Sequence, residues 1–130
     1  MIGLPRGVEV YLYNEPCDMR RSFNTLAALV RGQMKRDVLS GDLFVFVSRD
    51  RKRAKVLHFD GTGMGLYAKR MDKGEFVAPW KMKRAQLTLS ELALFIEGSD
   101  AVRQRLSPSV MRKADIFLSP KATEELFESS

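Results

Sequence analysis

The pattern of hydrophobic and polar positions divides the chain into short strands and two helices. Residues 8–13 are β-branched or aromatic at most positions and alternate, which is typical of a strand. Residues 43–47 are apolar throughout, so they predict a central strand covered on both faces. Strand-like segments follow at 55–59, 65–71 and 75–78, separated by short turns. We therefore predict an antiparallel meander of four to five strands.

Two segments have the periodicity of amphipathic helices. Apolar residues recur at helical spacing over about 19–34, and Asp18 stands before them as an N-cap candidate. Thr88 and Glu91 have the spacing of a capping box, and the apolar positions after them lead to Gly98, a common helix stop. The predicted fold class is therefore α+β, with one long N-terminal and one short C-terminal helix packed on the meander.

The periodic pattern weakens after residue 98. We expect a single domain over 1–98 and a C-terminal tail over 99–130 that is extended or partly helical. No apolar run approaches the roughly 18 residues of a membrane span, and no secretory signal is visible at the N-terminus. Cys17, the single cysteine, allows neither an internal disulfide nor a thiolate metal cage and is best explained as a packed small residue. We expect a cytoplasmic protein with no membrane association.

The charge of the chain gives the first indication of a function. The chain has 22 basic and 16 acidic residues, a net charge of +6. Residues 1–84 carry a net +8 and residues 85–130 a net −2, which favours a polyanionic partner. In a meander, alternate turns lie at the same end of the sheet, so the loop 49–53 and the turn 72–74 are expected together. The cations that would meet there, called here the basic rim, are Arg49, Arg51, Lys52, Arg53, Lys55, Lys69, Arg70 and Lys73.

Further cations near the first helix are second-tier candidates for phosphate contact, namely Arg20, Arg21 and Arg31. Arg20 and Arg31 share a stripe with Lys35 at helical spacing, for which an ordinary solvated helix face is the favoured explanation and a phosphate-tracking edge the alternative.

Aromatic residues among the basic ones offer a second kind of contact. Trp80 stands between basic residues and is the best candidate for an exposed ring that stacks on a base. Tyr67 and Phe76 are expected in the core.

Catalytic constellations are weak in this sequence. His58 and Asp60 share a strand face, but no motif places a nucleophile beside them, so a packed or half-exposed strand histidine is favoured. A small metal-dependent nuclease using Asp60 with Asp42 or Glu75 is a minor alternative, because most of the acidic residues in this part of the chain occupy cap or turn positions. We expect no enzymatic activity, no cofactor and no bound metal.

Several motifs, in order and spacing, carry a resemblance to a known family over roughly residues 1–98. The matching segments are Asp18-Met19-Arg20-Arg21 with Phe23 and Leu26, Gly41–Phe46, the basic loop with Lys55, Asp60-Gly61-x-Gly63, Lys69-Arg70, Gly74-x-Phe76 and Leu92–Gly98. With these segments the chain resembles the small accessory transposition protein (TnpB type, Orf2-like) of the IS-sixty-six group of bacterial insertion sequences. One departure is that Trp80 stands one place past Pro79, where the family pattern has tryptophan before the proline.

The resemblance implies a helper of transposition, encoded beside a larger transposase that carries the strand-transfer chemistry. With the basic rim, it leads to the hypothesis of a non-catalytic protein that binds DNA at the ends of the insertion sequence. The alternative is a protein-interaction adaptor that docks on the transposase, or associates with a second copy of itself, without touching DNA.

Overall fold

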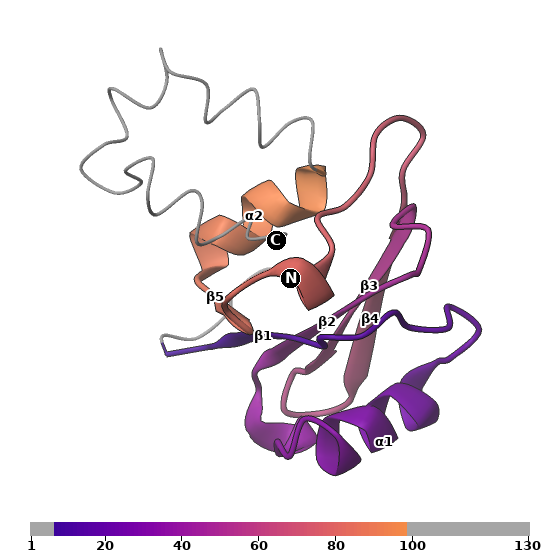
Figure 1. The fold of residues 1–130 in the computed structure, drawn as a ribbon. Coiled ribbons are helices and arrows are strands. Elements are labelled where there is room, and N and C mark those ends of the chain that lie inside the picture. The colour runs from indigo at the N-terminus through magenta and orange to yellow at the C-terminus, as the bar shows by residue number, and fades with distance from the viewer. Residues whose placement is uncertain (1–6, 99–130) are drawn as a thin grey trace.

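The computed structural model describes residues 7–98, which form one mixed β-sheet with a helix against each face (Figure 1). The strand order is β4-β3-β2-β1-β5. The strands are β1 (Val10–Leu12), β2 (Leu43–Val47), β3 (Arg53–Phe59), β4 (Met64–Arg70) and β5 (Gln86–Leu87). The helices are α1 (Phe23–Gly32) and α2 (Leu89–Glu97), with single 3₁₀ turns η1 (Val38–Ser40) and η2 (Pro79–Lys81).

The central strand β2 is buried along its whole length, as its apolar run predicts. Its odd-numbered side chains join a core with Leu92 and Phe95 of α2. Its even-numbered side chains, Phe44 and Phe46, join a second core with Leu26 and other residues of α1. The sheet therefore separates two hydrophobic cores. Each core lies under one of the two helices, which Figure 1 shows on opposite sides of the sheet.

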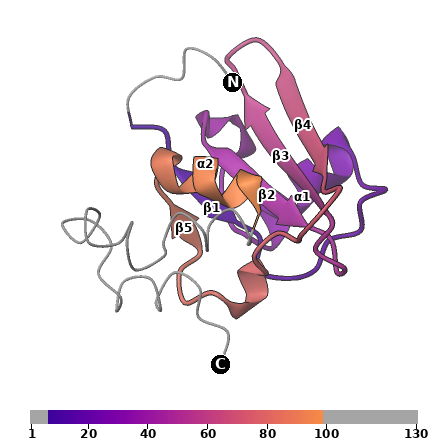
Figure 2. The same cartoon turned by 90° about the horizontal axis from the view of Figure 1, so that it is seen from above.

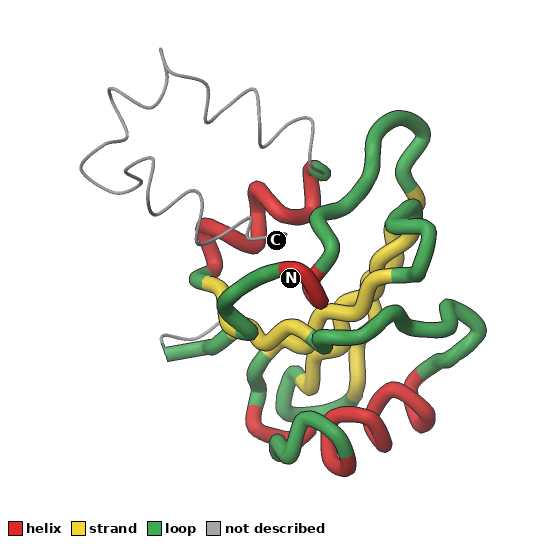
Figure 3. The backbone as a smooth tube through the Cα atoms, viewed as in Figure 1, coloured by secondary structure: helices red, strands yellow, loops and turns green. Residues whose placement is uncertain are grey.

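The sheet is mixed, so the prediction of an antiparallel meander is only partly right. β2, β3 and β4 form the expected antiparallel meander. β1, however, pairs with β2 in parallel, with Val10 opposite Leu43 and Leu12 opposite Val45. Parallel neighbours need a long crossover, and residues 13–42 supply one that places α1 on one face of the sheet (Figure 3).

The segment 75–78 is not a strand, which corrects the prediction of a fourth meander strand there. The chain leaves β4 and turns back over the sheet end, where the Phe76 N–H donates to Arg51 O at 2.8 Å. Phe76, Val77 and Ala78 are all buried, with the Phe76 ring stacked on Phe95 at 6.3 Å. Successive burial without alternation is what a segment laid across a core requires, rather than a half-exposed strand.

The first helix is shorter than predicted and begins at Phe23 with Ser22 as its N-cap. Asp18 is not the cap, because its carboxylate closes its own turn by accepting the Arg20 N–H at 2.9 Å. The helix ends at Gly32, and Lys35 soon after has a φ of 58°, which no helix accommodates.

The second helix matches its prediction. The Thr88 hydroxyl accepts the Glu91 N–H at 3.1 Å, and the Glu91 carboxylate accepts the Thr88 N–H at 2.9 Å. Gly98 ends the helix with a φ of 96°. The predicted tail, 99–130, lies outside the described residues, so both the tail and the domain boundary at 98 stay predictions.

Thr88→Ala should lower the free energy of unfolding by about 1 kcal/mol, because α2 loses one partner of its capping box. Urea denaturation followed by circular dichroism measures this change. Ser90→Ala, at an exposed position of the same helix, is the matched control and should change stability by less than about 0.5 kcal/mol. Equal losses in the two variants would contradict the capping role.

Candidate nucleic-acid interface

The loop between β2 and β3 is held by Ser48, the only buried polar residue among 7–98. The Ser48 N–H donates to Arg53 O at 2.9 Å, and its hydroxyl accepts the Arg53 N–H at 3.1 Å. The hydroxyl also donates to Asp50 Oδ1 at 2.6 Å, which is the main reason why the pKa of Asp50 lies below its ordinary value. The loop therefore has a fixed shape.

The structure brings this loop and the turn after β4 to the same end of the sheet, as the meander geometry predicts. The Met71 N–H donates to Lys52 O at 2.7 Å, and Arg51 and Lys52 both bind the turn. The Arg51 guanidinium pairs with Glu75 at 2.7 Å, and the Lys52 ammonium donates to Gly74 O at 2.8 Å. These two cations fasten the loop to the turn.

Two further rim residues act as internal hydrogen-bond donors. The half-buried Lys55 Nζ donates to the carbonyls of Met19 at 2.8 Å and Arg21 at 2.7 Å, which holds the start of the α1 region on β3. Lys69 Nζ donates to Ile96 O at 2.9 Å, near the C-terminus of α2, where a cation is favoured. Half of the predicted rim therefore serves the fold.

The four remaining rim residues are exposed, namely Arg49, Arg53, Arg70 and Lys73. Arg53 and Arg70 are directly opposite each other on β3 and β4. The neighbouring pair Lys52–Met71 is hydrogen-bonded, and the two kinds of pair alternate in an antiparallel ladder, so Arg53–Arg70 is a non-hydrogen-bonded pair. In such a pair the Cα atoms lie about 4.5 Å apart, and both side chains point to the same face of the sheet. Like charges placed in this way destabilise a sheet unless an anion lies between them.

Of the three second-tier cations, Arg20 and Arg21 lie near the Arg53–Arg70 pair, whereas Arg31 lies farther away. Arg20 and Arg21 lie on the α1 face beside Lys55, two positions along β3 from Arg53. Arg20 already pairs with Asp18 at 2.6 Å, which holds the pKa of that carboxyl well below its usual range. Arg31 is in the last turn of α1, about 12 Å along the helix from its start.

Beside these cations lies a polar pocket that the sequence pattern did not indicate. Arg21 and Arg49 line a cavity of about 420 Å³ together with Tyr13, Cys17 and Gln33. Burial raises the pKa of the Cys17 thiol, so the thiol stays protonated and packed, as expected. Burial likewise raises the pKa of Tyr13, whose hydroxyl donates to Gln33 Oε1 at 2.8 Å.

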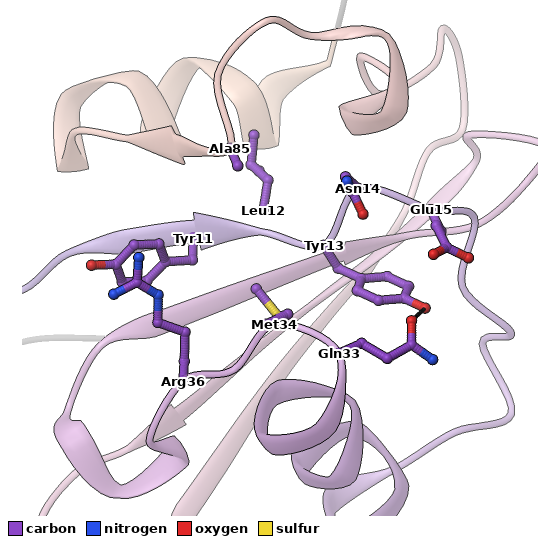
Figure 4. Close-up of a pocket in the computed structure, with 9 residues that line it drawn as sticks. All are labelled: Tyr11, Leu12, Tyr13, Asn14, Glu15, Gln33, Met34, Arg36 and Ala85. Atoms are coloured by element: carbon purple, nitrogen blue, oxygen red, sulfur yellow. Dashed lines mark hydrogen bonds between the residues drawn. The ribbon is translucent and has the colours of Figure 1, made fainter.

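The adjoining pocket of about 200 Å³ shares Tyr13, Glu15 and Gln33 with the first (Figure 4). Arg36 lies over the Tyr11 ring, with its guanidinium carbon 3.9 Å from the ring centroid. Tyr11 lies in β1 and Tyr13 directly follows this strand, so both side chains point to the same face of the sheet. In the sequence, a residue that lines a pocket on that face has the same alternation as a residue of the core. The two pockets are therefore visible only in the structure.

The aromatic candidates divide differently from the prediction. Phe76 is buried, as expected. Trp80, the candidate for an exposed stacking ring, is only partly exposed and packs against the core under α2. Tyr67 is 42% exposed on β4, although the sequence favoured a core position for it.

The candidate catalytic carboxylates have structural roles, and His58 lies half-buried on β3. Asp60 Oδ1 accepts the N–H groups of Thr62 and Gly63, both at 2.9 Å, and so closes the β3–β4 turn. Asp42 accepts the Glu9 N–H at 3.0 Å. Within residues 7–98, no group of three or more histidine, cysteine or carboxylate side chains is placed to hold a metal ion. In the same range no helix has the length and apolar character needed to cross a membrane.

The chain folds as a small α+β protein with a mixed sheet, and exposed cations lie at one end of that sheet. The chain belongs to the family described as IS66 Orf2 like protein, whose model it matches over residues 8–106. The family indicates an accessory role in the transposition of an insertion sequence.

Two similar relatives come from Sinorhizobium fredii. The uncharacterized protein y4jC is 36% identical over 110 residues, which cover 83% of this chain and 93% of the relative. The uncharacterized protein y4hO is 42% identical over 100 residues, or 75% of this chain and 87% of the relative. No solved structure matches the chain.

Lys55→Met should lower the free energy of unfolding by about 2 kcal/mol, because two hydrogen bonds from a charged donor are lost and the methylene packing is kept. Urea denaturation measures the loss. Lys73→Met, which removes the same charge from an exposed turn, is the control and should change stability little. A Lys55 variant as stable as the control would show that the cation does not hold the α1 region.

Asp60→Ala should destabilise the protein most at neutral pH. Backbone N–H groups of Thr62 and Gly63 hold the pKa of Asp60 below its ordinary 3.8, so its contribution is complete above about pH 4 to 5. The contribution is lost as the pH falls through the lower, folded-state pKa. Thermal unfolding of both proteins between pH 7 and pH 3 should show the difference in melting temperature shrinking with acid. A constant difference would contradict the carboxylate's role.

Proposed function

We propose that the chain is a non-catalytic DNA-binding accessory protein that contacts phosphates at or near the ends of its insertion sequence. The directly opposed pair Arg53 and Arg70 carries this proposal. Both side chains are exposed, and the sheet places them together at a cost that an intervening phosphate would relieve. The buried Ser48 and the Arg51–Glu75 ion pair hold the surrounding loop and turn in place. The backbone that carries the exposed cations therefore does not have to become ordered when DNA binds.

The surface around this pair extends the contact. Arg49 and Lys73 lie on the loop and the turn at the same sheet end. Arg20 and Arg21 lie on the α1 face beside Lys55, and Arg21 lines a pocket together with Arg49. Contacts of this kind supply affinity and salt dependence but carry no sequence information themselves. Any preference for the element's ends therefore needs a second contribution, from DNA shape or from the larger transposase as partner.

The experiment is a fluorescence-anisotropy titration with an element-end duplex and a scrambled duplex at several salt concentrations. The test variant is Arg49→Gln with Arg53→Gln and Arg70→Gln, which leaves the structural cations Arg51 and Lys52 intact. Each lost phosphate contact should lower the slope of log affinity against log salt by about 0.9, so the slope should fall by almost three.

The matched control removes three exposed cations elsewhere: Arg31→Gln, Lys35→Asn and Lys81→Gln. Asparagine is chosen at position 35 because it tolerates the positive φ there. Both variants have the same net charge, so a slope lowered only in the test variant locates the site. Equal slopes in the test and control variants would mean that the affinity depends on net charge and not on this site. If the wild type does not bind DNA even at low salt, the adaptor alternative, in which the chain docks on the transposase, remains.

A further inference from the structure

The two edges of the sheet differ in how they are protected. β5 is only two residues long and leads directly into α2. β4 has seven residues, contains no proline, and has no charged side chain between Met64 and Ala68. Figure 2 shows β4 as the outermost strand beside β3. Long neutral edges expose unpaired backbone groups, and proteins usually shorten, bulge or charge such edges.

The β3–β4 ladder shows which backbone groups of β4 point outward. The Asp60 N–H bonds Gly63 O at one end of the ladder, and the Met71 N–H bonds Lys52 O at the other. Hydrogen-bonded pairs alternate in an antiparallel ladder, so the odd-numbered residues of β4 bond β3. The even-numbered residues direct their N–H and C=O groups away from the sheet, and no strand within 7–98 pairs with them; they are Met64, Leu66, Ala68 and Arg70.

We propose that this edge pairs antiparallel with β4 of a second copy of the chain, about a two-fold axis at Tyr67. In this register Leu66 exchanges backbone hydrogen bonds with the partner's Ala68, and Met64 with the partner's Arg70. Tyr67 then forms a non-hydrogen-bonded pair with its own counterpart. All seven residues of β4 take part, and two five-stranded sheets become one continuous sheet.

Charge and exposure favour a second copy in this register. Arg70 lies opposite the partner's Met64, and Lys69 lies opposite the partner's Gly65, so the cations of the two strands avoid each other. A parallel, in-register pairing would instead set each cation beside its equal. The Lys69 ammonium is already bound to Ile96 O over its own α2, so it does not shield the edge. Tyr67, which is 42% exposed, gains an aromatic cross-strand partner.

Sedimentation equilibrium of the full chain without DNA tests the association. The wild type should have twice the mass of one chain, and Ala68→Pro should be monomeric. Proline removes an outward N–H that β3 does not use, so the circular dichroism spectrum should be unchanged. Ala68→Thr retains this N–H and is the matched control, which should remain dimeric. A wild type that is monomeric up to hundreds of micromolar, or a dimeric Ala68→Pro, would overturn the proposal.

Disulfide trapping tests the register even if the proline variant fails to fold. In a Cys17→Ala background, Tyr67→Cys places two thiols in a pair whose Cα atoms lie about 4.5 Å apart, within the range of a disulfide. Gly65→Cys places them four residues apart, roughly 14 Å, which is too far. Oxidation should cross-link the first variant and not the second, and the reverse result would overturn this register.

Hydrogen exchange separates a second copy from another occupant of the edge. The outward amides of Leu66 and Ala68 should be protected in the dimer and exchange faster on dilution to the monomer. Protection that persists in a monomer would assign the edge to another segment of the same chain and overturn the proposal. None of these measurements involves DNA. A result against the dimer therefore does not contradict the DNA-binding proposal, and a result against DNA binding does not contradict the dimer.

Discussion

The structure depends on the burial of β2 on both of its faces. None of its five side chains is exposed, and each apolar side chain of this size stabilises the fold by about 1.5–3 kcal/mol when buried. Water must therefore be excluded above and below one strand, which requires a helix on each side. α1 covers the first face on the way into β2, and α2 covers the other at the end of the described chain. Within residues 7–98, no strand pairs with the outer edge of β4, and the loop 49–53 meets the turn 72–74 at one end of the sheet.

The sequence predicts the parts of this fold that follow from local pattern. The apolar run of β2, the capping box of α2 and the Asp60 turn each depend on neighbouring residues, and each is correct. The parallel pairing of β1 is not predictable in this way, because it depends on where the crossover returns. The same holds for 75–78, whose apolar residues suit a strand but lie across a core.

The sequence predicts that the loop 49–53 and the turn 72–74 meet, but not which of their cations stay exposed. Strand order alone brings the loop 49–53 and the turn 72–74 together. It does not show which cations remain available, because a lysine that donates to a carbonyl has the same sequence signature as one that meets solvent. Lys55 and Lys69 illustrate this, since each binds a backbone oxygen more than twenty residues away. The contact between loop and turn similarly occupies Arg51.

The proposed dimer and the proposed phosphate contacts constrain each other geometrically. A two-fold axis perpendicular to the sheet keeps both α1 faces on the same side, so the Arg53–Arg70 pairs of the two copies face the same direction. Arg70 and the partner's Arg70 are six residues apart along the paired strands, or about 20 Å. Phosphates along one DNA strand are about 3.4 Å apart in rise, so this separation corresponds to roughly six nucleotides. One dimer would then contact a duplex at two symmetric points, and binding at the first would raise the effective concentration at the second.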